Sequence, residues 1–115
     1  MKDLGLPKSR RLKKQSEFRR LYQTGRKASD RYLTVYTCPV EGRGGKVGIV
    51  TGKKVGKPVE RNRIRRVLRE IVRTTHRDAI RHSDLVIIVR PAALELSHHE
   101  LAQHLLDVLR KSGAD

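Results

Sequence analysis

Five apolar residues recur at helical spacing within residues 58–76, and most of the positions between them are arginine. Spacings of three and four residues place the five on one face of an α-helix, which predicts a helix with one buried side. The apolar stripe consists of Ile64, Val67, Leu68, Ile71 and Val72. The opposite side collects Asn62, Arg66, Arg69, Arg73 and Arg77, with Arg63 beside them and Arg61 and Arg65 near one border of the stripe.

The basic side of this helix has two interpretations. Charge runs usually form an ordinary solvated face, but here only Glu60 and Glu70 balance the arginines. Arginine is also the side chain best suited to bidentate contacts with phosphate. The composition of this side therefore favours an anionic partner, and phosphate binding in particular.

Strand patterns lie on both sides of the predicted helix. Residues 31–38 are rich in β-branched and aromatic side chains, and residues 46–51 follow after a glycine-rich turn, which predicts a β-hairpin. A basic loop, residues 52–58, leads into the helix. Residues 84–90 form a nearly continuous apolar run, which is typical of a strand buried on both faces.

Two further helices are predicted, one near each end of the chain. The first is capped by Gln15 or Ser16 and stops at Gly25, and the last begins with a capping box formed by Ser97 and Glu100. The stripe that the last helix buries is Leu101, Leu105, Val108 and Leu109. The order helix, strand, strand, helix, strand, helix predicts an α+β domain with helices packed on a small mixed sheet. By the general rule, the strand–helix–strand unit from residue 46 to 90 would be right-handed.

Charge narrows the class of partner. The 115 residues carry 27 lysines and arginines against 12 acidic residues, a formal net charge of +15. Residues 1–31 hold 11 basic and 3 acidic side chains, whereas residues 82–115 hold 3 basic and 5 acidic ones. One folded domain with a basic side predicts a polyanion, with nucleic acid as the first choice and an anionic membrane surface as the second. Residues 1–14, which show no periodicity, are expected to form a basic irregular arm of this single domain, residues 1–115.

The compartment follows from what the sequence lacks. No apolar run reaches the length of a membrane span, and the first residues do not resemble a secretion signal. The single cysteine, Cys38, has no internal disulfide partner, which fits a reducing cytoplasm. We therefore expect a cytoplasmic protein with no membrane partner, and we interpret Cys38 as a small buried hydrophobic residue rather than a nucleophile.

No self-contained active site is evident. The five histidines, His76, His82, His98, His99 and His104, stand in no metal-ligand motif. His76 and His82 leave a fortuitous metal site open, but a solvated helix end is the more common reading. The glycines near Gly52 do not fit the spacing of a phosphate-binding loop, and Lys53 is followed by lysine rather than serine or threonine. The sequence predicts no catalytic residue and no metal site.

All four aromatic residues lie within residues 18–36. Phe18 and Tyr22 share a helical face, and Tyr32 and Tyr36 share a strand face with Thr34. If helix and strand pack together, these side chains line a groove whose rim carries Arg11, Lys13, Lys14 and Arg19. Aromatic side chains in a basic channel bind single-stranded nucleic acid by stacking. Alternatively, Phe18 and some of the tyrosines fill the core; for Phe18 the two readings are equally balanced, and the polar tip of Tyr36 favours the groove.

The segment Val47–Glu70 closely resembles the signature of the bacterial ribonuclease P protein component. It contains a strand, the Lys53-Lys54-Val55-Gly56 loop and the Arg61-Asn62-Arg63 motif at the start of the helix. Arg11-Leu-Lys-Lys with Phe18, Tyr22 and Gly25-Arg26, and the strand before Arg90-Pro91, are similar to other parts of that family. Gly52, Pro58 and Val67 depart mildly from the family pattern.

The resemblance implies a fold of about four strands and three helices, ribosomal-protein-S5-domain-2-like, with a left-handed βαβ crossover instead of the usual right-handed one. It also implies a subunit that binds a catalytic RNA, one protein per RNA, and assists removal of the single-stranded 5′ leader from precursor tRNA. Catalysis and most Mg²⁺ binding would belong to the RNA. The residues facing the catalytic RNA would be Lys53, Lys54, Lys57, Arg61, Asn62, Arg63, Arg66 and Arg69. The leader cleft would comprise Phe18, Tyr22, Thr34 and Tyr36, with Arg11, Lys13 and Lys14.

Two other functions compete with this one. A structural RNA-binding protein of ribosomal type would share the basic helix, and an autonomous basic nuclease would share the charge. The missing acid–base constellation argues against the nuclease. Cleavage of precursor tRNA by protein alone, by RNA alone or only by both together separates the three functions.

Overall fold

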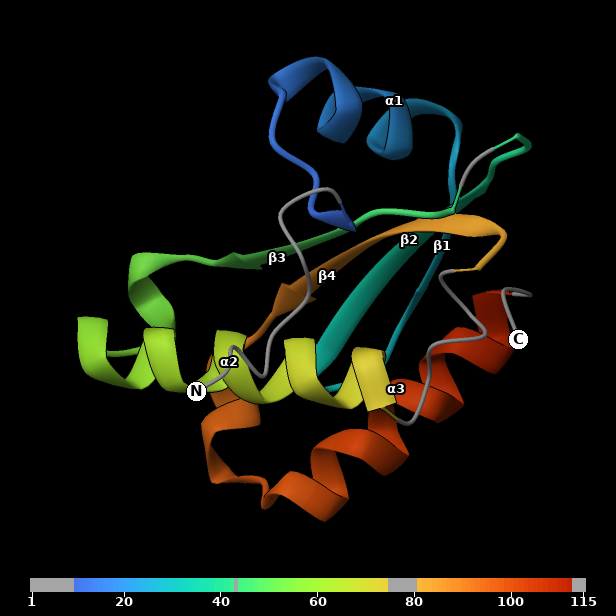
Figure 1. Ribbon diagram of the computed structural model, residues 1–115. Helices are drawn as coiled ribbons and strands as arrows, with labels where there is room; N and C mark the ends of the chain where they lie inside the picture. Colours follow the sequence, from blue (N-terminus) through green and yellow to red (C-terminus); the bar gives the residue numbers. More distant parts are fainter. Residues whose placement is uncertain (1–9, 43, 75–80, 113–115) are drawn as a thin grey trace.

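The computed structural model describes residues 10–42, 44–74 and 81–112. A four-stranded sheet in the order β1-β2-β4-β3 separates α1 on one face from α2 and α3 on the other (Figure 1). The elements in chain order are α1 (Gln15–Thr24), β1 (Arg26–Ser29), β2 (Leu33–Pro39), β3 (Val47–Thr51), the 3₁₀ turn η2 (Lys53–Val55), α2 (Pro58–Thr74), β4 (Ser83–Val89), the 3₁₀ turn η3 (Pro91–Glu95) and α3 (His98–Ser112). The α+β prediction is confirmed.

The strand pairing differs from the predicted hairpin. β2 pairs antiparallel with β1 and β4, whereas β3 pairs with β4, in parallel, and not with β2. β4 is the most apolar strand and is buried on both faces, so it occupies the centre of the sheet and separates β2 from β3. The hairpin between residues 31–38 and 46–51 was therefore wrong. β1, which is short, polar and mostly exposed, was not predicted.

The crossover from β3 through α2 to β4 is left-handed. In Figure 1, β3 and β4 run from right to left, β4 lies below β3, and α2 passes in front of the sheet. When the picture is turned so that both strands point upward, β4 lies to the left of β3. About 98% of such units turn the other way, so the general rule gives the wrong hand for this chain. The hand implied by the family resemblance is the observed one.

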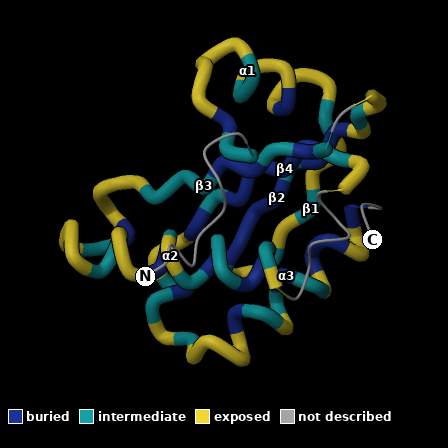
Figure 2. Tube along the Cα trace, viewed as in Figure 1, coloured by how far each residue is buried: buried dark blue, intermediate teal, exposed yellow. Residues whose placement is uncertain are grey.

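The larger core lies between the sheet and the helices α2 and α3 (Figure 2). The predicted stripe of α2 is buried at four positions and partly buried at Val67, and the predicted stripe of α3 is buried throughout. The capping box is also confirmed, since the Glu100 amide donates to Ser97 Oγ at 3.1 Å and the Ser97 amide donates to Glu100 Oε1 at 2.9 Å. Residues 75 and 76 of the predicted helix lie outside the described residues.

A smaller core holds α1 on the opposite face of the sheet. It contains Leu12, Leu21, Cys38 and Val86, so Cys38 is a buried small residue as predicted. The N-cap is Lys14 rather than the predicted Gln15 or Ser16, because the Glu17 carboxylate accepts the free amides of Lys13 and Lys14. It ends at Gly25, where a Cβ would lie 2.5 Å from the Leu21 carbonyl oxygen.

The described part of the predicted arm is fixed to the sheet. Arg11 forms a parallel bridge with Val47, and the Leu12 amide donates to the Val47 carbonyl at 3.0 Å. These contacts cover the start of the free edge of β3. Residues 1–9 of the arm lie outside the described residues. No helix in the described ranges combines the length and hydropathy of a membrane span.

Candidate nucleic-acid interface

An open cleft of about 470 Å³ runs between α1 and the β3 side of the sheet. Its lining is Gln15, Phe18, Arg19, Tyr22 and Val50, and we call it the α1 cleft. Phe18 and Tyr22 are one helical turn apart, so both rings project on the same side of α1. The ring of Phe18 lies against Gly48, where a Cβ would come within 2.5 Å of it. Any larger residue at Gly48 would therefore displace the Phe18 ring.

Tyr22 is the most accessible aromatic ring of the cleft, with 42% of its surface exposed. Its ring meets that of Tyr36 edge to face, with centroids 5.0 Å apart, and Lys27 Nζ lies 5.8 Å from the centre of the Tyr36 ring. Burial, and secondarily Tyr36, raise the pKa of Tyr22, so its hydroxyl stays neutral at physiological pH. Tyr36 thus supports Tyr22 and is itself only partly exposed.

The other two members of the predicted groove are placed differently. Thr34 shares the sheet face of Tyr36, but it is buried, and its hydroxyl accepts a hydrogen bond from Arg90 Nε at 3.3 Å. Tyr32 does not lie on this face: its ring packs 4.6 Å from that of His104 in α3. The turn at Asp30, whose carboxylate accepts the Tyr32 and Leu33 amides, breaks the alternation before β2 begins. Grouping Tyr32 with Tyr36 was therefore wrong.

A second hollow, of about 410 Å³, lies at the free edge of β3. We call it the edge hollow; it is lined by Arg11, Leu12, Lys13, Phe18, Val47, Gly48, Ile49 and Arg69. Its cations come from two places, since Arg11 and Lys13 precede α1 and Arg69 belongs to α2. Phe18 lines both spaces, so the edge hollow continues the α1 cleft toward α2. Lys14 is exposed at the start of α1, next to this rim.

The outer side of α2 carries the predicted basic residues. Asn62, Arg63 and Arg66 are exposed there, and together with Arg69 at the edge hollow they form the arginine face. Arg65 is instead used internally: it donates to Thr51 Oγ1 in β3 at 2.5 Å and to Asn62 Oδ1. Asn62 is thereby oriented by its neighbour. Arg61, toward the stripe, is partly buried, and its Nε makes no hydrogen bond within the described residues.

The turn before α2 presents the predicted lysines. Lys53, Lys54 and Lys57, the lysine loop, are all exposed, whereas Val55 between them is buried and anchors η2. The Lys57 amide donates to Glu60 Oε1 at 2.9 Å, which caps the first turn of α2. The lysines therefore stand at one end of the arginine face on a fixed turn.

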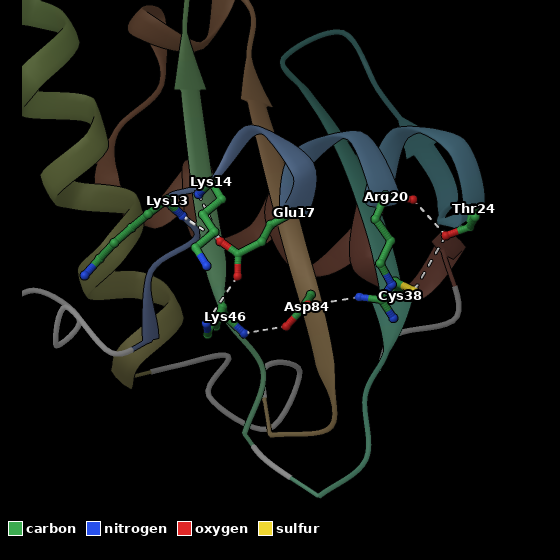
Figure 3. Close-up of polar contacts among 8 residues, drawn as sticks. All are labelled: Lys13, Lys14, Glu17, Arg20, Thr24, Cys38, Lys46 and Asp84. Atoms are coloured by element: carbon green, nitrogen blue, oxygen red, sulfur yellow. Dashed lines mark hydrogen bonds and ion pairs between the residues drawn. The ribbon is translucent and has the colours of Figure 1, made fainter.

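Two carboxylates behind α1 were not predicted as part of the site (Figure 3). Glu17 accepts the amides of Lys13 and Lys14 at 3.0 Å each and Lys46 Nζ at 3.2 Å. These amides, followed by the ammonium of Lys46, lower the pKa of Glu17 to about 2. Asp84, buried in β4, accepts the Lys46 amide at 2.8 Å and pairs with Arg20 at 3.4 Å. The spacing of Glu17 three residues after the N-cap was the signal in the sequence.

A family model described as Ribonuclease P matches residues 6–113. The chain belongs to the ribonuclease P protein family. The Ribonuclease P protein component of Desulforamulus reducens is 42% identical over 101 residues, which cover 87% of this chain and 88% of that protein. That of Geobacillus sp. is 36% identical over 110 residues, or 95% of each chain.

Solved structures of ribonuclease P proteins are similar throughout the fold. The Staphylococcus aureus RNase P protein is 32% identical with a TM-score of 0.83, covering 93% of this chain and 98% of that one. The RNase P protein from Thermotoga maritima, in complex with 1-(4-fluorophenyl)-2-thiourea, is 26% identical with a TM-score of 0.79, covering 88% and 98%. As a ribonuclease P protein, this chain is the protein part of a ribonucleoprotein endoribonuclease.

Within the described residues, no three histidine, cysteine or acidic side chains come together as metal ligands. His76, one of the pair noted in the sequence, lies outside those residues. Glu17 and Asp84 are both engaged by cationic side chains and backbone amides. The described site therefore presents mainly cationic side chains, which are suited to anions.

Proposed function

We propose that this protein subunit of ribonuclease P holds the single-stranded 5′ leader of precursor tRNA in the α1 cleft while its arginine face and lysine loop bind the catalytic RNA. The two surfaces differ in chemistry. The cleft offers aromatic rings at its open side, and the α2 surface offers exposed guanidinium and ammonium groups almost without acids.

The α1 cleft suits unpaired nucleotides because stacking requires a free base face. Tyr22 is exposed, is kept neutral, and is held edge-on by Tyr36, so its ring is presented in a defined orientation. Phe18 forms the inner wall above Gly48. Base stacking on such rings contributes about 1–3 kcal/mol per base and depends little on sequence. A subunit that serves many tRNA precursors needs this tolerance.

The arginine face suits a folded RNA because guanidinium groups pair with phosphates in bidentate geometry. Arg63 and Arg66 project from adjacent turns of α2, and Asn62 is fixed by Arg65. Lys53, Lys54 and Lys57 extend the same surface at the start of the helix. The repulsion among these cations is relieved when phosphates lie against them.

The edge hollow is the observation that best supports this proposal, because the α1 cleft and the arginine face meet there. Phe18 of the cleft and Arg69 of α2 line the same space across Gly48 and Ile49. A leader strand leaving the cleft in this direction would reach the catalytic RNA bound on α2. The geometry therefore supports simultaneous contact of one protein with both RNAs, and we propose a complex with one protein per catalytic RNA.

In this proposal the RNA subunit performs the hydrolysis, and the protein alone is inactive. Mg²⁺ would be held mainly by the catalytic RNA and the substrate, whose phosphate oxygens are ligands that this ion commonly takes. The chain's part is to bind and align the leader, so that the scissile phosphodiester stands at the RNA's active site. Because Cys38 is the single cysteine of the sequence and is not in a disulfide, we propose that the protein acts in a reducing cytoplasm.

One cleavage assay tests this function. Precursor tRNA is incubated at low Mg²⁺ with the protein alone, with a bacterial ribonuclease P RNA alone, and with both. We expect cleavage that leaves a mature 5′ phosphate only when both are present. Cleavage by the protein alone would indicate an autonomous nuclease, and no effect of the protein on the RNA would indicate a structural RNA-binding protein; either result contradicts the proposal.

A further inference from the structure

Glu17 is an anomaly on a surface that should bind phosphates. Residues 1–31 hold 11 basic and 3 acidic side chains, and one of these acids lies next to Phe18 in the sequence of α1. A free carboxylate at this position would repel a leader strand. Both its oxygens instead accept hydrogen bonds from the chain, Oε1 from the Lys13 and Lys14 amides and Oε2 from Lys46 Nζ.

These contacts join three segments at one carboxylate. The amides belong to the segment that bridges β3 and leads into α1, Glu17 itself is in the first turn of α1, and Lys46 directly precedes β3. Since these contacts tie the start of α1 to the residue before β3, the first turn of the helix is held in place above the sheet (Figure 3).

A second pair of contacts continues the same connection. The Lys46 amide donates to Asp84 Oδ1 at 2.8 Å, and Asp84 Oδ2 pairs with Arg20 at 3.4 Å. Arg20 is three residues after Glu17 on α1, so the helix is attached to the sheet at two points on one side. We call Glu17, Lys46, Asp84 and Arg20 the α1 clamp.

The clamp and the cleft lie on different sides of the same helix. At 100° per residue, Glu17 and Arg20 fall within about 60° of each other, whereas Phe18 and Tyr22 lie on the side that lines the cleft. Leu21, completely buried, lies between the two sides. Rotation of α1 about Leu21 would lift Phe18 from Gly48 and change the width of the cleft, and the clamp opposes this rotation.

We infer that Glu17 is a positioning residue for leader binding, acting through Lys46 and the backbone of Lys13 and Lys14 to fix the α1 cleft. The inference rests on the proposed function, because it assigns Glu17 a role in holding the leader. It also explains why Lys13, whose side chain extends toward α2 in Figure 3, lines the edge hollow together with Arg69.

The direction in which leader affinity changes when Glu17 is substituted distinguishes a positioning role from a simple charge effect. If Glu17 were only an acid near RNA, removing its charge would reduce repulsion and strengthen binding of every RNA. If it positions the cleft, Glu17→Gln weakens binding of the leader although the protein becomes more basic. The low pKa of Glu17 means that the carboxylate stays charged across the assay range, so the variant removes a real charge.

The test uses holoenzyme reconstituted from the full chain and a bacterial ribonuclease P RNA. Dissociation constants are measured for precursor tRNA, for mature tRNA and for the catalytic RNA with Glu17→Gln, with Lys46→Met and with the double variant. We expect each single variant to raise the precursor dissociation constant about ten-fold, the loss of one charged hydrogen bond, and the double variant to add little. Mature tRNA and catalytic RNA affinities stay within about two-fold, and KM rises while kcat at saturating substrate is retained.

Glu41→Gln provides the matched control, because Glu41 is exposed and the substitution changes the net charge equally. Unchanged or tighter precursor binding by Glu17→Gln would overturn the inference. A parallel loss of all three affinities with a lowered unfolding temperature would also overturn it, since Glu17 would then only stabilise the fold. If the wild-type holoenzyme itself fails to prefer precursor over mature tRNA, the proposed function fails instead.

Discussion

Substituting Gly48 by alanine should damage the α1 cleft from below. A Cβ at this position would lie 2.5 Å from Phe18 Cε1, 2.7 Å from Phe18 Cζ and 3.2 Å from Leu12 Cδ1. Carbon atoms in contact prefer about 3.5–4.0 Å, so the ring must retreat by roughly 1 Å. Leu12 blocks one side, so we expect Phe18 to move outward into the cleft.

The magnitude follows from two effects. Inserting a methyl group into a packed contact costs about 1–3 kcal/mol of stability, and each kcal/mol lowers Tm by about 4 °C in a chain of this size. Displacement of Phe18 removes up to one stacking surface, so precursor affinity of the holoenzyme falls about ten-fold while mature tRNA affinity is unchanged. Thermal unfolding and equilibrium binding measure the two effects separately.

Two further variants make this prediction refutable. Gly52→Ala, directly after the same strand, is the control, because nothing lies within 4 Å of its added Cβ, and it should change neither quantity. In a double variant with Phe18→Ala, Gly48→Ala should cost nothing further, because the clashing ring is gone. Full stability and full leader preference in Gly48→Ala would show that Phe18 is not seated on β3.

Three other predictions address the neighbouring features of the site. Tyr36→Ala removes the edge contact that holds Tyr22, so it should raise the precursor dissociation constant about ten-fold without changing mature tRNA affinity; equal weakening of both would make Tyr36 a core residue. Binding of the catalytic RNA should show a slope near −3.5 in log K against log salt for about five phosphate contacts, and a slope near zero would mean that the net charge is idle. Glu17, with its pKa lowered from an ordinary 4.5 to about 2, adds stability above pH 4.5 that is lost as the pH falls toward 2. Denaturant unfolding across this range should show a smaller acid loss for Glu17→Gln, and identical curves would contradict that assignment.

Periodicity within a segment was sufficient to predict the three helices and the strands β2, β3 and β4, because the physical cause is local. The stripes of α2 and α3 and the apolar run of β4 each occupy one contiguous stretch, and burial follows from it directly. Strand order is not local. β3 follows β2 in the chain, yet the more apolar β4 takes the central place between them, and a polar edge strand such as β1 has no apolar signal.

The same distinction applies to the site. Phe18 and Tyr22 could be paired from their spacing, and the arginine face from the helical wheel. The placement of Tyr32 depended on the Asp30 turn, which changes the phase of the strand. The contact of Phe18 with Gly48 and the clamp through Lys46 and Asp84 join residues far apart in the chain, so only the folded structure reveals them.

The central claim is that leader and catalytic RNA are bound by different surfaces, and a crossed comparison of two variants tests it most directly. Tyr22→Ala alters the α1 cleft, and Arg63→Ala with Arg66→Ala alters the arginine face. The measurement is the ratio of mature to precursor tRNA dissociation constants in assembled holoenzyme, together with the affinity of each protein for the catalytic RNA. We predict that Tyr22→Ala lowers the ratio about ten-fold and keeps RNA affinity, whereas the arginine variant weakens RNA affinity by about 1–3 kcal/mol per contact and keeps the ratio. If both variants lower both quantities together, the two surfaces are not separate, and the account is contradicted.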